Sequence, residues 1–212
     1  MKKIALTLGI ITLCINMLKA QLEDIDPNYL NTLNNRAGKI VEKLNLDNKD
    51  QAERVTRIIV IQYYELSKIH DTRDEKLKAI NNLEEGEKEE VKNMIQVETN
   101  SDLYKLHAAY VAKLSAELTP DQVEQVKDGM TYGVLQHTYT GYLNLLPNLT
   151  DEQKIYIFAN LAEAREFAMD AGSSKAKHGW FGKYKGRINN YLSNAGYDLK
   201  KAEEELKARE GK

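Results

Sequence analysis

The stretch from Lys175 to Tyr197 combines aromatic and basic side chains in a pattern that could bind a ligand. It holds the only tryptophan of the chain, and no acidic residue occurs between Asp170 and Asp198. Aromatic rings offer flat faces for stacking, while lysine and arginine bind anions. The composition therefore predicts a surface for a flat, anionic ligand. Its candidate residues are His178, Trp180, Lys183, Tyr184, Arg187, Asn190 and Tyr191.

A second candidate region lies between Gly133 and Gly141, where β-branched and aromatic residues predominate. This composition predicts an irregular loop or a short strand near residues 131–147. Loops on a rigid scaffold often carry functional side chains. We expect either a connector whose tyrosines pack on the protein, or a loop that presents His137 and Tyr139 to a ligand.

Arg165 falls near the centre of an apolar arc in the helix expected after Thr150. An arginine that faces inward stays charged, so it needs a carboxylate, backbone carbonyls or a cavity. Two interpretations follow. Arg165 either forms a buried ion pair with another helix, or binds an anion in a pocket shared with the stretch 175–197.

The elements that must position these residues are helices. Asp26-Pro27 is a typical helix start, and Asp47 is expected to cap the next helix, which is apolar nearly all round over RIIVIQYYEL. A third helix should run from about Glu87 to Leu118, where Asn100-Ser101 could interrupt it. The pattern predicts an all-α bundle of long helices, with the basic-aromatic stretch folded across it, in a single domain over residues 21–212.

The motif Leu-Thr-x-x-Gln occurs twice, over residues 118–122 and 149–153. Each copy predicts a capping box, in which the threonine accepts from a free backbone amide and the glutamine bonds back to the threonine. The repeated motif also resembles that of periplasmic stress chaperones of the Spy and CpxP kind. That resemblance implies a chaperone or partner-binding function as one alternative.

Residues 1–20 are typical of a secretory signal peptide, with Lys2 and Lys3 before an apolar run and Ala20 at the expected cut. The run is too short for a membrane span. Its removal takes away three lysines, which leaves 27 basic and 32 acidic residues, and also the only cysteine, Cys14. We therefore expect a periplasmic or secreted protein with no membrane span in the mature chain, and an acidic balance that does not favour nucleic acid.

The run DGMTYG and the longer run EAREFAMDAGSSKAKHGWFGKYKGRINNYLSNAGYDLKK closely resemble a family of exported helical proteins of unknown function. These proteins come from polysaccharide-degrading Gram-negative anaerobes. The resemblance implies no mechanism, but it suggests a setting in glycan metabolism. It also implies that the family motif includes Trp180, Gly182, Lys183, Tyr184, Gly186, Arg187, Asn189, Asn190 and Tyr191.

Three classes of function are open. The first is a protein that binds an acidic sugar or polysaccharide, with rings on the sugar faces and cations on uronate carboxylates. The second is a lyase or hydrolase that uses His137 or His178 with Arg165 or Arg187. The third is a structural or chaperone-like bundle. The four histidines are scattered, and no metal or cofactor spacing occurs, so neither a metal nor a cofactor is predicted.

Overall fold

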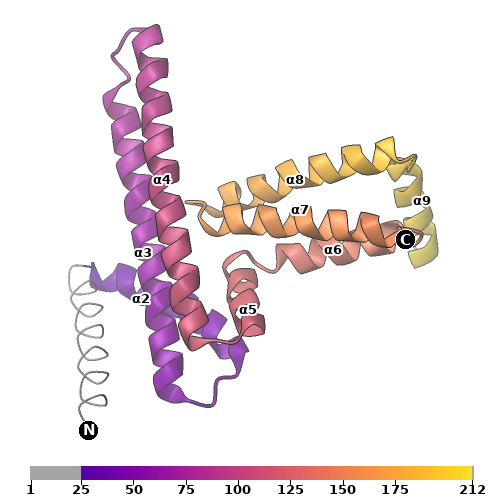
Figure 1. Cartoon of the computed structure of the whole chain (residues 1–212), viewed down its shortest axis with the longest axis horizontal. Helices are drawn as coiled ribbons and strands as arrows, with labels where there is room; N and C mark the ends of the chain where they lie inside the picture. Colours follow the sequence, from indigo (N-terminus) through magenta and orange to yellow (C-terminus); the bar gives the residue numbers. More distant parts are fainter. Residues whose placement is uncertain (1–24, 212) are drawn as a thin grey trace. The chain divides into compact units, whose positions relative to one another are not determined.

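A computed structural model describes residues 25–211, and this range is all-α, with helices α2 to α9, one short 3-10 helix and no strand (Figure 1). The predicted fold class is confirmed. The expected signal peptide, residues 1–20, lies outside the described residues. The described part of the chain has no helix that is long and apolar enough to cross a membrane. The chain divides into two compact units between Val123 and Glu124, inside α5.

The first unit is built from α2 (Pro27–Val41), the 3-10 helix η1 (Glu42–Leu44), α3 (Lys49–Ala79) and α4 (Glu85–Glu117). The predicted start of α2 is confirmed, because the Asp26 carboxylate accepts from the amides of Asn28 and Tyr29. The predicted cap of α3 is wrong by one residue. Asn48 accepts from the Gln51 amide, since η1 and a left-handed Asn45 shift the turn by one position.

Helix α3 is the central helix of this unit. Its middle is buried on consecutive residues from Ile58 to Ile61, as the apolar run predicted. Helix α4 packs along it as a hairpin partner and runs without a break through Asn100 and Ser101. The interruption that these two residues could have caused does not occur, because a long contact with α3 outweighs their weak helix preference.

Gln62 is a polar residue in the buried part of α3, with only 2% of its surface exposed. Its amide nitrogen Nε2 forms no hydrogen bond. A buried donor without a partner costs about 1–3 kcal/mol of stability. The sequence alone did not reveal whether this side chain faces inward.

We expect Gln62→Leu to keep or raise the melting temperature, because it removes this unsatisfied amide and fills the same space. The matched change Gln62→Glu should lower the melting temperature, because it buries a carboxylate. Thermal melts followed by circular dichroism measure both. A clear loss of stability in Gln62→Leu would show that the buried side-chain amide of Gln62 does not destabilise the fold.

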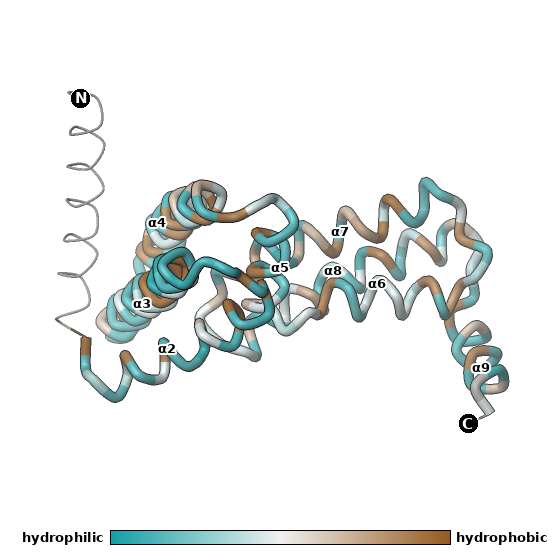
Figure 2. Tube along the Cα trace, turned by 90° about the horizontal axis from the view of Figure 1, so that it is seen from below, coloured by the Kyte–Doolittle hydropathy of each residue, from teal (hydrophilic) through white to brown (hydrophobic). Residues whose placement is uncertain are grey.

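The second unit contains the rest of α5 (Pro120–Met130), α6 (Val134–Leu145), α7 (Asp151–Met169), α8 (Ser174–Asn194) and α9 (Leu199–Glu210). Apolar and polar positions alternate along these helices, as Figure 2 shows. Both predicted capping boxes are present. Thr119 and Gln122 exchange hydrogen bonds at the start of α5, and Thr150 and Gln153 do so at the start of α7.

The segment 131–147 is not the irregular loop that its composition predicted, because residues 134–145 form α6. Two left-handed residues, Tyr132 and Gly133, separate it from α5. Packing then outweighs local propensity: Leu135 is fully buried, and the buried Tyr142 hydroxyl donates to Asn189 Oδ1 at 2.6 Å. That burial raises the pKa of Tyr142 to about 12.

The core of this unit is formed by the apolar faces of α6, α7 and α8, with α9 packed against α6. Its fully buried members include Ile157, Leu161, Phe181, Ile188 and Leu192. The basic-aromatic stretch thus forms most of α8, an integral helix of the second unit, rather than a segment laid over a finished bundle.

Lys177 joins three helices of the second unit. Its side chain is buried, and Nζ donates to the carbonyls of Met130 at 3.0 Å and Met169 at 3.4 Å. These two residues end α5 and α7, where the helix dipole and the free carbonyls attract a cation. The buried ammonium therefore stabilises two helix ends at once.

Replacing Lys177 by Met should destabilise the protein by about 2–3 kcal/mol, because two bonds to a charged group are lost inside the protein. Urea unfolding measures this difference. Lys175→Met, on the exposed side of the same helix turn, is the matched control and should change stability by less than about 0.5 kcal/mol. Equal effects of the two changes would contradict the role assigned to Lys177.

Candidate binding face on helices α7 and α8

Helices α7 and α8 lie side by side and run in opposite directions, because only a short turn joins Met169 to Ser174 (Figure 1). On each helix, four residues at spacings of four, three and four occupy one face. We call these eight residues the strip. The α7 row is Tyr156, Asn160, Glu163 and Phe167, and the α8 row is Trp180, Tyr184, Arg187 and Tyr191.

Each end of the strip is a stacked aromatic pair. Phe167 and Trp180 have ring centroids 4.6 Å apart and an interplanar angle of 17°. At the other end, Tyr156 and Tyr191 lie 3.9 Å apart at 25°. Stacked pairs of this kind hold their rings in fixed orientations. The two ends of the strip therefore present ordered rings rather than loose side chains.

The middle of the strip is polar and centred on Arg187. Its guanidinium carbon lies 4.4 Å from the Tyr184 ring centroid, and Nη1 contacts Glu163 Oε2 at 3.3 Å and Asn160 Oδ1 at 3.4 Å. Burial, and then a hydrogen bond with Glu163, raises the pKa of the Tyr184 hydroxyl. Tyr184 therefore stays protonated around neutral pH and can support Arg187 without adding charge.

A second cation borders the strip. Lys183 is exposed, and its ammonium lies 5.0 Å from the Trp180 ring centroid. Glu163 is the single acidic residue among the eight, and Lys183 and Arg187 together outweigh it. The strip itself is neutral, and Lys183 at its border gives this region one net positive charge in a protein whose overall charge is negative.

The structure brings together four of the residues that the sequence named, namely Trp180, Lys183, Tyr184 and Arg187, and it places Tyr191 at the far end of the same strip. Four partners on α7 were missed. The sequence pattern that could have identified them is the spacing of positions 156, 160, 163 and 167, which matches that of the α8 row. This spacing becomes informative only when α7 and α8 are known to be neighbours.

The remaining candidates lie elsewhere. His178 stacks on the Tyr132 ring at 5.7 Å, and it lies about 160° around α8 from Trp180 at 100° per residue. Tyr139 packs edge-on against Phe158. His137 and Asn190 are exposed. Among residues 25–211, no hydrogen bond or ion pair joins His137 or His178 to Arg165 or Arg187, whose partners are Asp128 and Asn160 among others.

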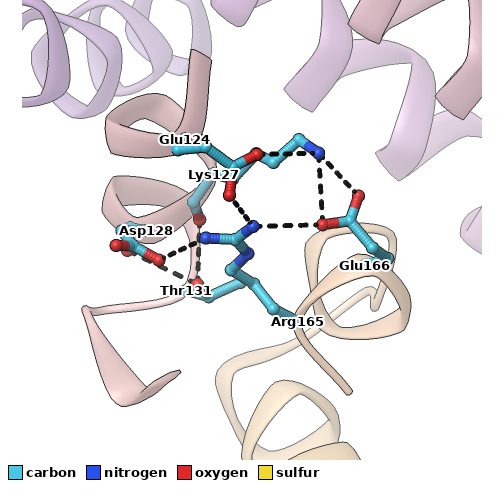
Figure 3. A network of polar contacts seen from close by, with 6 residues as sticks. All are labelled: Glu124, Lys127, Asp128, Thr131, Arg165 and Glu166. Atoms are coloured by element: carbon cyan, nitrogen blue, oxygen red, sulfur yellow. Dashed lines mark hydrogen bonds and ion pairs between the residues drawn. The ribbon is translucent and has the colours of Figure 1, made fainter. Parts of the chain in front are cut away.

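Arg165 faces inward, as its place in the apolar arc predicted, and only 3% of it is exposed. Of the two interpretations, the structure shows the buried ion pair with another helix. Nη1 bonds Asp128 Oδ1 at 2.8 Å, and Nη2 contacts Glu124 and, at 3.4 Å, Glu166 (Figure 3).

Lys127 completes this network by pairing with Glu124 at 3.3 Å and with Glu166 at 3.1 Å. Two cations thus meet three carboxylates, which leaves a net negative charge that would repel an anion. Burial alone would raise the pKa of Glu124, but the hydrogen bond and charge of Arg165, together with Lys127, lower it. The network joins α5 to α7, and its net charge disfavours an anionic ligand at Arg165.

Arg165→Met should destabilise the protein by about 3 kcal/mol, because it strands the Asp128 carboxylate and leaves Glu124 and Glu166 with Lys127 as their shared cation. This loss lies at the lower end of what breaking a buried ion pair usually costs, because the Glu124 side chain is half exposed and can regain water. Chemical denaturation measures the change. Arg187→Met removes an exposed arginine and should cost less than about 1 kcal/mol. A neutral Arg165→Met would contradict the structural role.

The stability difference between the wild type and Arg165→Met should depend on pH. The lowered pKa of Glu124 means that its contribution is fully present at neutral pH and is lost as the pH falls and the carboxylate becomes protonated. The stability difference between the wild type and Arg165→Met should therefore shrink on acidification. A difference that grew at low pH would contradict this assignment.

The fold and the strip define an all-α protein whose second unit carries an aromatic and cationic face. Its sequence matches the model of a family described as "Protein of unknown function (DUF3826)" over residues 30–211, and the chain belongs to that family. This confirms that it is a member of a family of unknown function. A comparison with curated proteins finds no match.

Proposed function

We propose that the strip on α7 and α8 binds an acidic polysaccharide, or an oligosaccharide derived from one. The observation that carries this proposal is Arg187, which is stacked on Tyr184 between two aromatic pairs on the surface of one unit. Aromatic rings suit the apolar faces of sugar rings, and an arginine suits the carboxylate of a uronic acid.

Arg187 is suited to bind a ligand anion because its present partners hold it weakly. Its contact with Glu163 is 3.3 Å long, and both side chains are about half exposed, at 47% and 52%. Exposed ion pairs of this kind contribute little to stability. Stacking on Tyr184 fixes the plane of the guanidinium, so less entropy is lost when a carboxylate binds. Glu163 and Asn160 would then accept from sugar hydroxyls.

The dimensions of the strip favour an oligomer over a single sugar. From residue 156 to residue 167, an α-helix rises about 16 Å. An extended ligand along this line would meet a stacked pair at each end and Arg187 between them. Lys183, beside Trp180, would bind a second carboxylate of the same chain. The ligand class is therefore a polymer with repeated negative charges and exposed sugar faces.

A secretory leader at residues 1–20 would bring this face to the compartment in which such polymers are found. The proposed role is that of an exported glycan-binding protein in the periplasm or outside the cell. The family resemblance to exported proteins of polysaccharide degraders supports the same setting by association.

Trp180 provides a direct test, because it is the only tryptophan of the chain and lies in the strip. Titration with galacturonate oligomers should change its fluorescence, whereas neutral galactose oligomers should not. Binding should strengthen from short to longer oligomers and weaken with added salt, since exposed charge pairs are screened.

Matched variants assign the binding to the strip. Arg187→Ala should weaken uronate binding at least about tenfold, equivalent to roughly 1.4 kcal/mol. Lys185→Ala removes a cation from the same helix, but from another side, and should leave the affinity unchanged. Equal weakening in both variants would indicate attraction by general charge. A wild type that binds no uronate oligomer, in fluorescence and in calorimetry, would refute the proposal.

A further inference from the structure

Helix α4 in the first unit carries a second apolar row that its own unit does not cover. The inner row, which includes Ile95, Tyr110 and Leu114, is buried. On another face, Met94, Val97 and Tyr104 are exposed to 66%, 69% and 77%. Met94 and Val97 line a groove of about 750 Å³ on the surface of α4, together with Glu98, Ser101 and Lys105.

The spacing of this outer row is that of a coiled-coil seam. Positions 94, 97, 101, 104, 108 and 111 alternate steps of three and four, and they hold Met, Val, Ser, Tyr, Ala and Val. Alternate steps of three and four keep the row on the side that faces a partner helix. A single surface helix packed on one neighbour needs only one apolar row. We call the six positions the outer seam.

We propose that the outer seam of α4 pairs with the same seam of a second copy of this chain, with the two helices antiparallel. The argument for a second copy is that the seam is complementary to itself. In this arrangement the large Tyr104 meets the small Ser101 of the other copy, Val97 meets Ala108, and Met94 meets Val111. A two-fold axis repeats every contact, as expected for a symmetric dimer.

The charges beside the seam support the antiparallel direction. Glu98 and Lys105 occupy the same flanking position in successive heptads. With antiparallel helices, Glu98 lies opposite Lys105 of the other copy, and the pair forms twice. A parallel, in-register pair would instead set Ser101 against Ser101 and Tyr104 against Tyr104, and would bring Glu98 and Lys105 opposite Asn93 and Asn100. Antiparallel pairing therefore matches both size and charge.

The helix is already in place for such a contact. Its inner row holds α4 against α3, so its residues lose little conformational freedom on dimerisation. At present Glu98 pairs with Lys76 at 2.6 Å, and Lys105 pairs with Asp102 at 3.3 Å, all four being exposed. Exposed pairs are weak and can rearrange. The seam rises only about 26 Å along the helix, so the dimer should be concentration-dependent rather than permanent.

Sedimentation velocity of the purified protein over a wide concentration range tests the proposal. We expect a monomer–dimer equilibrium. Glu98→Lys and Lys105→Glu should each weaken it, by about tenfold, because each sets like charges opposite one another across the two-fold axis. The combined variant, with both changes, should restore the affinity to near the wild-type value.

Matched controls separate the seam from general charge effects. Glu89→Lys and Lys113→Glu change exposed residues of α4 away from the seam and should leave the equilibrium unchanged. Val97→Asp should abolish the dimer while circular dichroism shows unchanged helicity. A wild type that is monomeric at every concentration, a dimer that survives Val97→Asp, or a double swap that fails to restore association would each overturn the proposal.

Discussion

The second unit depends on the burial of one face of α8 against α7. Phe181, Ile188 and Leu192 on α8, and Ile157 and Leu161 on α7, are fully buried in one core. Their burial fixes the rotation of both helices about their own axes, since a turn of either helix would expose apolar surface at about 25 cal/mol per Å². Every side chain at the edge of this contact is positioned as a consequence.

The strip is such a consequence. Tyr184 belongs to both the core and the strip. It is buried in the core, and the guanidinium of Arg187 stacks on its ring. The rows on α7 and α8 can meet only in the register that the core imposes. The proposed binding face therefore results from packing at the border of the core, and its geometry should be as rigid as the core itself.

Much of this could be predicted from the sequence, because local signals determine local structure. The Asp26-Pro27 start and the two capping boxes were read correctly, since capping chemistry involves residues only two or three positions apart. The segment around Tyr142 was misread as a loop, because its β-branched and aromatic residues are held in a helix by the core and by Asn189, 47 positions away. The α7 half of the strip was missed for the same reason: Glu163 and Phe167 gain meaning only from their neighbours on α8.

The two central arginines show how burial decides between structure and function. Arg165 and Arg187 have the same charge, and both contact carboxylates. Arg165 is enclosed, so the structure itself must neutralise it, and three carboxylates do this, two of which also pair with Lys127. Arg187 is half exposed, is offset by one weakly held carboxylate, and stacks on a tyrosine. Water can solvate it in the free protein, and a ligand carboxylate can replace that water at little cost. Arg187, which the fold offsets only weakly, is thus the better suited of the two arginines to the proposed ligand.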